Sequence, residues 1–527
     1  MIIFALGGRK PVDKAMPTET INARTTNLAP SITYTLETVP LPTNTPTATL
    51  EPTATPLPDP SYHVSTNGND ANDGRTKDNA FTSIQKAIQS ASAGDVVYVH
   101  AGTYQENIIV DKAIFLIGEN PETTIIQGSK TGDVVTISSN DVLLSSFSII
   151  DSGTAYISPF DGGDAAVKLE HVQNVIVSNI YVTDSTLGIF LNYSDHNTLE
   201  KNTTLKNFYE GVYLRYSNNN LVQKSTSNQN GGHGGYYVVN GSENHIVNNV
   251  CDDNPDHGIK LQRQSNNNLV EYNRCTGNVQ SGIFLVDSYH NIIRNNDFIK
   301  NCAGAFIRLS DFNLIEENNF HENENGITLD FASFENIIRN NTTTNNWGGI
   351  SIRYSSNRNL ITGNTVTSNN SPGIEIKYSS ENEVSKNLIT ENGEGLTFVC
   401  GDPIHIAPDV ESVTWEQFNK MEGYFEKFRE FVFDKGIVFS GKDCAGNKIF
   451  ENVIENNVNW GMVSSDSQFG YCQTEIEATN NWWGEPSGPY HPELHPSGQG
   501  MVISNGILYD PWLSSPPELP CSIIMAW

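Results

Sequence analysis

The stretch GIFLNYSDHNTLEKNTTLKNFYEG, residues 188–211, decides the fold because its pattern recurs along most of the chain. A glycine that precedes alternating apolar residues returns every 22 to 24 residues, at Gly211, Gly235, Gly258, Gly282, Gly304, Gly326, Gly349, Gly373 and Gly395. A second motif, Asn-x-[Ile/Leu/Val]-x-x-[Asn/Ser], keeps the same period from Asn197 to Asn382. Two markers that share one period indicate an internal repeat, and a period of this length indicates a solenoid.

Each repeat holds two short apolar alternations, such as Ile189/Leu191 and Leu199, which is strand periodicity without a helical stripe. Strands of this kind stack in parallel on the equivalent strand of the next coil. Asparagine tolerates the left-handed conformation at a tight bend, and stacked amides can bond along a ladder. The glycine column indicates positive φ or close backbone approach. The sequence therefore predicts an all-β fold, a right-handed, single-stranded parallel β-helix.

The repeats also set the expected boundaries. We expect the β-helix to span residues 61–515, with a closing segment at 480–515 and a C-terminal tail at 516–527. Residues 1–60 are expected to be disordered, and residues 37–60 contain seven Thr and seven Pro, the composition of an extended stalk.

Two helices are expected outside the regular coils. Residues 82–93, TSIQKAIQSASA, form an amphipathic pattern, and this helix would cap the N-terminal end of the coil. In residues 402–435, a capping box at Thr414 precedes apolar residues at helical spacing, which predicts a helix inserted into a turn.

The repeats resemble those of pectate-lyase-like parallel β-helix proteins, and of the NosD-like group in particular. The ending NNWWG at residues 480–484, with SGP at 487–489 and DPWL at 510–513, resembles the closing segment of that group. The resemblance covers residues 61–515. It implies the fold, whereas the superfamily contains lyases, hydrolases, epimerases, accessory proteins and adhesins.

Charge and composition restrict the partners and the location. The 60 acidic and 31 basic residues give a net charge of −29, which argues against nucleic acid and anionic membrane surfaces as partners. The sequence has no run of 18 apolar residues, so we expect no membrane-spanning segment. The stalk favours a secreted or cell-surface protein, although a signal peptide is not evident in residues 1–20. We expect a monomer.

The cysteines and the metal question have several interpretations. Cys251 and Cys275 occupy one repeat position and are expected to be stacked, buried thiols. Cys400 and Cys444 flank the insertion, and a disulfide could bridge its base. We expect no metal centre and no certain cofactor. Ca²⁺ at the polar loop of residues 61–80, which holds Asp70, Asn72 and Asp73, is one interpretation, and a turn-rich loop explains it equally well.

One sheet is expected to present an exposed face. The second residue after each repeat glycine gives the column Phe190, Tyr213, Tyr237, Lys260, Phe284, Phe306, Thr328, Ser351 and Glu375. The fourth gives Asn192, Arg215, Val239, Gln262, Val286, Arg308, Asp330, Arg353 and Lys377. Aromatic rings at about 4.8 Å per coil would stack on sugars, or they could simply stabilise the ladder. We assign substrate binding to Phe190, Tyr213, Phe284, Phe306, Arg263, Arg308 and Arg353.

The densest group of polar residues on this face spans three coils and suggests a lyase. Its members are Glu210, Tyr213, Arg215, His233, Tyr237, Asp256, His257, Lys260 and Arg263, followed by Asp287. A polysaccharide lyase needs a cation for the uronate carboxylate, a base for the C5 proton and a donor to the leaving oxygen. Lys260 or His257 could be the base, Arg215 or Arg263 the cation, and Tyr237 the donor.

The same group also allows hydrolysis. Glu210 and Asp256 lie two coils apart, about 9.6 Å by strand spacing, and a glycoside hydrolase uses two carboxylates at such a separation. A polar turn beside the sheet is the alternative without chemistry. Between Arg308 and Arg353, Asp330 is expected to form a surface ion-pair ladder.

Three functions remain open from the sequence. The first is an extracellular enzyme that acts on a polysaccharide, as a lyase or a hydrolase. The second is a non-catalytic, glycan-binding or adhesive surface protein. The third, implied by the resemblance, is a NosD-like accessory protein in metal-enzyme maturation.

Overall fold

The structure is a computed structural model that describes residues 59–400, 444–466 and 475–519. The chain divides into two compact units, Met1–Leu57 and Pro58–Trp527, and the described residues belong to the second. The inserted helix expected at 402–435 lies outside the described residues, as does most of the stalk.

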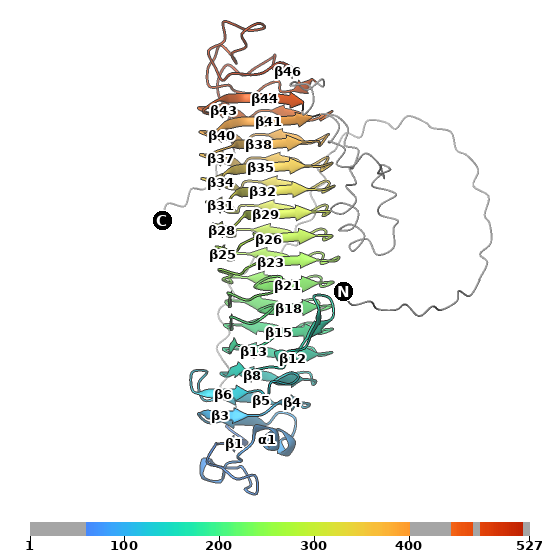
Figure 1. Cartoon of the computed structure of the whole chain (residues 1–527), viewed down its shortest axis with the longest axis vertical. Coiled ribbons are helices and arrows are strands. Elements are labelled where there is room, and N and C mark those ends of the chain that lie inside the picture. The colour runs from blue at the N-terminus through green and yellow to red at the C-terminus, as the bar shows by residue number, and fades with distance from the viewer. Residues whose placement is uncertain (1–58, 401–443, 467–474, 520–527) are drawn as a thin grey trace, which may run out of the picture. The chain divides into compact units, whose positions relative to one another are not determined.

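Three long parallel sheets build a right-handed parallel β-helix, which confirms the predicted fold class. Each strand pairs in parallel with the equivalent strand of the next coil; His257, for example, pairs with Ser281. Figure 1 shows the strands stacked one coil above another, with α1 and β1 at one end and β46 at the other.

Sheet C, which has 14 strands, carries the face discussed above. Its strands are β4 (Ile108–Val110), β7 (Val135–Ile137), β12 (Ala165–Glu170), β15 (Leu187–Asn192), β18 (Val212–Arg215), β21 (Tyr236–Val239), β23 (His257–Gln262), β26 (Ser281–Val286), β29 (Ala303–Arg308), β32 (Asn325–Asp330), β35 (Gly348–Arg353), β38 (Pro372–Lys377), β41 (Glu394–Cys400) and β44 (Trp460–Asp466).

Sheet A follows sheet C along each coil and has 17 strands. They are β1 (Tyr62–Val64), β2 (Val96–Val99), β5 (Phe115–Gly118), β8 (Leu143–Ser145), β13 (Ile176–Ser178), β16 (Thr198–Glu200), β19 (Leu221–Gln223), β22 (His245–Val247), β24 (Leu269–Glu271), β27 (Ile292–Arg294), β30 (Leu314–Glu316), β33 (Ile337–Arg339), β36 (Leu360–Thr362), β39 (Glu383–Ser385), β42 (Lys448–Phe450), β45 (Ile476–Glu477) and β46 (Ile507–Leu508).

Sheet B completes the coil in two parts, of six and seven strands. The first holds β3 (Gly102–Gln105), β6 (Thr124–Gln127), β9 (Ser148–Ile150), β14 (Tyr181–Thr183), β17 (Thr203–Leu205) and β20 (Thr226–Asn228). The second holds β25 (Arg274–Thr276), β28 (Asp297–Ile299), β31 (Asn319–His321), β34 (Thr342–Thr344), β37 (Thr365–Thr367), β40 (Leu388–Thr390) and β43 (Val453–Glu455). Single bridges at Val250 join the two parts.

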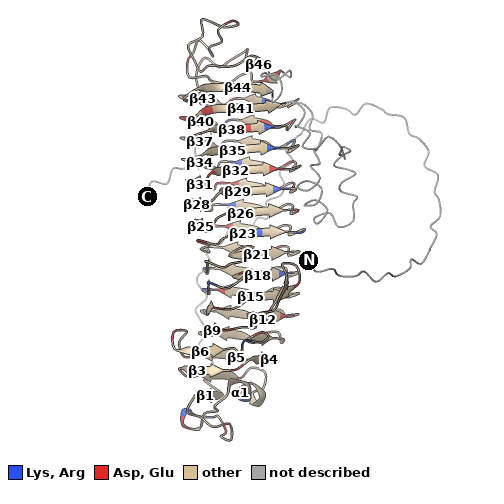
Figure 2. Ribbon diagram, in the orientation of Figure 1, with Lys and Arg blue, Asp and Glu red and all other residues tan. Residues whose placement is uncertain are grey.

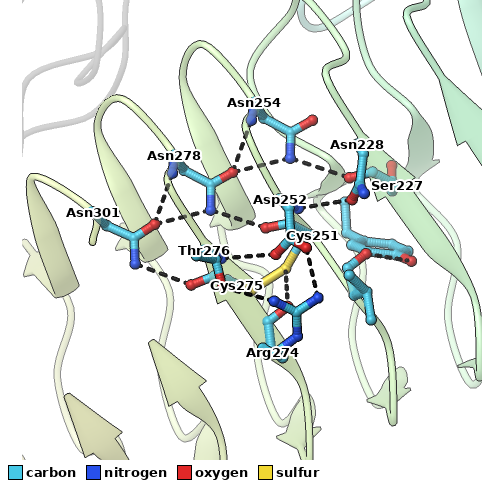
Figure 3. A network of polar contacts seen from close by, with 12 residues as sticks. Ser227, Asn228, Cys251, Asp252, Asn254, Arg274, Cys275, Thr276, Asn278 and Asn301 are labelled. Carbon is cyan, nitrogen blue, oxygen red and sulfur yellow. Dashed lines mark hydrogen bonds and ion pairs between the residues drawn. A yellow bond between two sulfur atoms is a disulfide. The ribbon is translucent and has the colours of Figure 1, made fainter. Parts of the chain in front are cut away.

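Asparagines form ladders, as predicted, but the stacked asparagines themselves do not adopt the left-handed conformation. In Figure 3, the Asn254 side chain donates to Asn278 Oδ1 at 3.0 Å, and Asn278 donates to Asn301 Oδ1 at 2.9 Å. In the ladder predicted from Asn197 onwards, positive φ falls on the residue before each asparagine, such as His196 at 58°. The amide therefore closes the corner through hydrogen bonds, and its neighbour makes the bend.

The repeat glycines are required by close approach. A Cβ at Gly258 would lie 2.7 Å from the carbonyl oxygen of Gly282 in the next coil. Any side chain here would force the coils apart, so the glycine column records the contact between coils.

The structure has two disulfides among the described residues, of which the sequence analysis predicted one. Cys251 and Cys275 were expected to be free thiols, which is wrong, because they form a disulfide between adjacent coils with a Cα–Cα distance of 4.5 Å. The two thiols stack in register at a spacing that a disulfide can bridge. The bridge between Cys400 and Cys444 is confirmed.

The N-terminal end is capped by α1 (Ile84–Ser90), next to a short 3₁₀ turn, η1 (Lys77–Asn79). Ile84, Ala87 and Ile88 are buried on its inner face, which agrees with the amphipathic pattern of residues 82–93. Asp70 accepts hydrogen bonds from the N–H groups of Thr82 and Ser83 at 2.8 and 3.0 Å, which ties the preceding loop to the start of the helix.

Candidate functional site

A hairpin of β10 (Tyr156–Ser158) and β11 (Gly162–Gly163) covers part of sheet C. The predicted exposed platform is wrong, because Phe190, Tyr213, Tyr237, Lys260 and Phe284 are all buried, the first three of them in a cluster with residues of the hairpin. The three rings stack in succession at centroid distances of 4.9 and 5.1 Å. Tyr213 donates its hydroxyl hydrogen to the Pro159 carbonyl at 2.8 Å, so the hairpin is bonded to the face that it covers.

The two arginines assigned to uronate binding contact this hairpin. Arg215 Nε donates to the Phe160 carbonyl at 2.5 Å, and its guanidinium pairs with Asp161 at 3.6 Å. The Arg263 guanidinium lies 3.3 Å from the centre of the Phe160 ring. Both cations therefore help to hold the hairpin, which explains why this chain of few basic residues places them here.

Further along sheet C, the predicted aromatic and ionic ladders are present. Phe284 and Phe306 stack at 5.4 Å. Arg308 pairs with Asp330 at 2.8 Å, and Arg353 lies 3.6 Å from the other oxygen of the same carboxylate. The ladder is confirmed, but Asp330 is buried rather than at the surface. Figure 2 shows acidic positions among the basic ones along sheet C, so the coloured residues form no continuous basic stripe.

Where the chain enters sheet C, a separate group of side chains converges on a buried carboxylate. Glu210 immediately precedes the repeat glycine, and its side chain is 0% exposed. Oε1 lies 3.0 Å from His233 Nδ1 and accepts a hydrogen bond from the Tyr156 hydroxyl at 3.3 Å. Oε2 has no hydrogen-bond partner among the described residues. An unpartnered buried carboxylate oxygen is costly, and such exceptions cluster at functional sites.

His233 is held in a defined orientation. Its ring stacks on Tyr237 at 5.4 Å, while Nδ1 faces Glu210 and the side chain remains 32% exposed. The lack of a side chain at Gly232 leaves room for this pair. A Cβ at that position would lie only 2.8 Å from Glu210 Oε1. A carboxylate behind an imidazole fixes the tautomer and leaves Nε2 available for proton transfer.

Lys260 lies on the next coil, between aromatic rings. Its ammonium is 5.3 Å from the centre of the Tyr237 ring and 5.5 Å from that of Phe284. Burial lowers the pKa of Lys260 to about 8, although the charges of Asp256 and Glu210 act in the opposite direction. At neutral pH the amine is still mostly protonated, so it supplies a positive charge within an enclosed site.

Asp256 and His257 complete the group. Burial raises the pKa of Asp256, against the opposing charges of Lys260 and His233. His257 Nε2 lies 3.3 Å from Asp256, and Nδ1 lies 2.7 Å from the Ser281 hydroxyl. Burial lowers the pKa of His257 well below its usual range, so this ring is neutral and positions Asp256.

The predicted site residues thus separate into two sets. Glu210, Tyr237, Asp256, His257 and Lys260 do come together, because parallel register places neighbouring coils side by side. Arg215 instead bonds to the hairpin. The Tyr237 hydroxyl donates to Gln262 at 2.8 Å and is fully buried, so it cannot protonate a leaving oxygen.

Sequence reasoning missed one contributor to this group. Tyr156 lies 54 residues before Glu210 in a segment without repeats, and its ring stacks on Tyr209 at 3.6 Å. No periodicity could have placed it there.

Comparison with known proteins identifies the family. The family model for NosD, described as a periplasmic copper-binding protein, matches residues 136–323 and 299–488, which together exceed half of the chain. The chain belongs to the NosD family. A search of curated proteins found no match.

Solved structures of low sequence identity also match this NosD-family chain. The A-module of the mannuronan C-5 epimerase AlgE6 from Azotobacter vinelandii is 15% identical, with 59% of this chain and 89% of that chain covered and a TM-score of 0.42. The Dettilon tailspike protein gp208 is 15% identical over 60% and 63%, with a TM-score of 0.43. The periplasmic alginate epimerase AlgG is 17% identical over 65% and 76%, with a TM-score of 0.40. We draw nothing about activity from likenesses of this degree.

The family description implies copper, so the donor set of the described residues matters. Copper prefers several imidazole, thiolate or thioether ligands around one point. Among the described residues, no three His, Cys, Asp or Glu side chains lie close enough to hold one metal ion. His63 Nδ1 and His100 Nε2 lie 3.2 Å apart, but Glu119 faces the far nitrogen of His100. These side chains do not fit a copper centre, and we assign no copper chemistry to them.

In the polar loop of residues 61–80, the side chains suggested as Ca²⁺ ligands are engaged in hydrogen bonds within the loop and to its neighbours, as in a turn-rich loop. Both oxygens of Asp70 accept hydrogen bonds from Ser83, Asp73 accepts one from the Arg75 N–H, and Asn72 donates to Ala80. The polar side chains therefore hold the loop itself. In the described part of the chain, no helix is long and apolar enough to cross a membrane.

Proposed function

We propose that this NosD-family chain processes an extended polysaccharide outside the cytoplasm, by acid–base chemistry at Glu210, His233, Asp256 and Lys260. The observation that carries the proposal is the buried Glu210 carboxylate, which orients an accessible imidazole and keeps an unpartnered oxygen. The stalk composition and the family description as periplasmic support the location.

The group suits β-elimination at a uronate residue. Oriented by Glu210, His233 Nε2 removes the C5 proton, and the electron pair of that C–H bond forms the C4–C5 double bond. The C4–O4 bond breaks, and the leaving oxygen takes a proton from the carboxyl of Asp256, whose pKa is raised by burial. The Lys260 ammonium faces the uronate carboxylate and stabilises the charge that develops there.

These assignments differ from those that the sequence suggested. Lys260 supplies the cation that Arg215 and Arg263 were expected to supply, and His233 takes the role of the base. The reason is geometric, since the two arginines bind the hairpin and His233 is the accessible partner of Glu210.

A panel of polyuronates, mixed glycans and neutral glycans tests the proposal. Unsaturated ends are followed by ultraviolet absorbance and reducing ends are followed separately. His233→Gln and Lys260→Met should each lower the rate of unsaturated product by about 100-fold or more, the usual contribution of a positioned acid or base. His245→Gln, which changes an exposed histidine on sheet A of the same coil, is the matched control.

Two results would overturn the elimination mechanism. Reducing ends without unsaturated ends would assign hydrolysis to the carboxylates of Glu210 and Asp256. Glycan binding without any product would make the chain a non-catalytic glycan-binding protein.

A further inference from the structure

A cavity lies along the solenoid next to the proposed site. It has a volume of about 460 Å³ and begins at Gly277, Asn278 and Val279, one coil beyond Asp256. It continues across Cys302 and Glu324 and reaches Trp347 and Asn370.

The register of sheet C shows that this cavity continues the line of the proposed site. His257 pairs with Ser281, Ser281 with Ala303, Ala303 with Asn325, and Asn325 with Gly348. The residues just before these form one column: Asp256, Gln280, Cys302, Glu324 and Trp347. Four coil spacings separate Asp256 from Trp347, about 19 Å, so a chain of several sugar residues spans the distance.

The lining suits a sugar ring. Trp347 and Val279 are each 63% exposed, although large apolar side chains are usually buried. An exposed indole beside the amides of a polar cavity offers an apolar face and hydrogen-bonding groups together, the combination that fixes a ligand in an open site.

The charges of the lining indicate which sugars fit. Lys300 pairs with Glu322 at 3.3 Å, and Glu324 accepts a hydrogen bond from the Cys302 thiol at 3.2 Å. Burial raises the pKa of this thiol to about 11, so it stays protonated and continues to donate. The lining therefore holds two carboxylates and one ammonium that is already paired, and a uronate carboxylate would be repelled here.

We propose that this cavity, the Trp347 groove, is an extension subsite that binds uncharged sugar residues of the glycan whose uronate reacts at His233. The inference rests on the proposed function and adds a substrate class to it. The substrate is a mixed polysaccharide in which neutral residues follow the reacting uronate within a few units.

The test compares oligosaccharide length and charge in the full chain. Hexamers and trimers of mannan, xylan and β-glucan, mixed glucuronate-containing glycans and alginate oligomers are titrated by calorimetry and assayed for turnover. Trp347→Ala should raise KM for long mixed substrates by about tenfold, equivalent to about 1.4 kcal/mol, with kcat and the trimer values unchanged. Tyr272→Ala, an exposed tyrosine that does not line the groove, is the control.

The results separate the inference from the proposed function. If Lys260→Met abolishes turnover but Trp347→Ala leaves the length dependence unchanged, the subsite is wrong and the function stands. If no glycan is turned over but neutral hexamers bind and Trp347→Ala abolishes that binding, the function is wrong and the groove stands as a neutral-glycan site. Tighter binding of alginate hexamers than of neutral ones at Trp347 would overturn the assigned substrate class.

Discussion

At the scale of single residues, Lys260 links stability to function. The pKa of its amine is about 8 in the folded chain and near 10.4 in an unfolded one. Because the unfolded chain binds the extra proton between these values, stability rises with pH from about 8 to 10.4. Below pH 8 the folded protein bears the full cost of a buried charge. The proposed mechanism requires that charge. The folded protein is therefore less stable than a variant with an apolar side chain at this position.

Lys260→Met should therefore stabilise the protein while it inactivates it. We expect about 3 kcal/mol of added stability at pH 7, which follows from the lowered pKa, and no difference at pH 10.5. Urea unfolding at the two pH values measures this. A variant that is less stable than the wild type at pH 7 would contradict the buried-charge account, and Lys377→Met, at a half-buried lysine of the same sheet, provides the comparison.

Activity should have an alkaline limit set by the same amine. As pH rises through about 8, Lys260 loses its proton and the uronate loses its cation, so kcat/KM should fall. Lys260→Arg keeps a positive charge at every accessible pH and should shift the fall to higher pH. The pH profile of the two proteins, measured on one substrate, distinguishes this from a structural effect, since loss of structure would lower activity at all pH values.

The asparagine ladders make another prediction at this scale. Asn318 Nδ2 donates to Asn341 Oδ1 at 3.0 Å and to the Ile293 carbonyl at 2.9 Å, while its Oδ1 accepts from Asn296. Asn318→Ala leaves several buried groups without partners, at about 1–3 kcal/mol each. We expect a loss of about 3–5 kcal/mol in chemical unfolding. Asn319→Ala, next in sequence and only half-buried, should cost less than about 1 kcal/mol.

Sequence alone predicted these columns but not every reason for them. The glycine and asparagine periods can be counted in the repeat, and stacking in register follows from the period. Which residue of Asn197 and its neighbour His196 takes positive φ depends on hydrogen bonds between coils. The disulfide of Cys251 was missed for a related reason, since stacking alone does not show whether two thiols are oxidised.

At the scale of elements, the β10–β11 hairpin changed the interpretation of sheet C. Alternation correctly placed the rings of Phe190 and Tyr213 on the outer face, but an outer face is exposed only if no other segment covers it. The hairpin has no repeat, so its destination could not be read from the sequence. It also brings Tyr156 to Glu210 and thereby connects an early coil to the proposed site.

Tyr156 is a positioning residue in this arrangement, and Tyr156→Phe tests it. The substitution removes one hydrogen bond to Glu210 and keeps the ring stacked on Tyr209. We expect kcat to fall by about tenfold, equivalent to about 1.4 kcal/mol, with KM unchanged. A change in KM alone would instead assign Tyr156 to substrate binding. Tyr181→Phe, on sheet B, is a control at a tyrosine outside the site.

The disulfide between coils makes a second prediction for the elements. Cys251 and Cys275 are 24 residues apart, and a closed loop of that length contributes about 3 kcal/mol in the chain-entropy account. The double substitution Cys251→Ala/Cys275→Ala should lower stability by about this amount, whereas a reductant, which also breaks the Cys400–Cys444 disulfide, should lower the stability of the wild type further. Mass spectrometry of the linked peptides verifies the pairing. Cys302→Ala, at the free thiol among the described residues, should leave stability within about 0.5 kcal/mol.

At the scale of the whole molecule, the solenoid provides spacing and the irregular residues provide chemistry. The regular coils from Gly188 to Gly395 repeat the same glycine, so a position beside it returns at the next coil about 4.8 Å away. Glu210, His233 and Asp256 lie close together in this way on three successive coils. Trp347 lies further along the same side of the solenoid. The dense group of polar residues on three successive coils was the signal in the sequence that pointed to this region.

The net charge of −29 also acts at this scale, through the rate of glycan association. A polyuronate approaches a like-charged protein, so at low salt its association should be slow. Raising ionic strength from about 0.01 to 0.15 M shortens the screening length from about 30 to 8 Å, and the association rate should then rise several-fold. A neutral glycan of the same length should show no such change. Stopped-flow measurements with both polymers decide this, because faster polyuronate binding at low salt would mean that a local group of cations, and not the acidic surface, governs the approach.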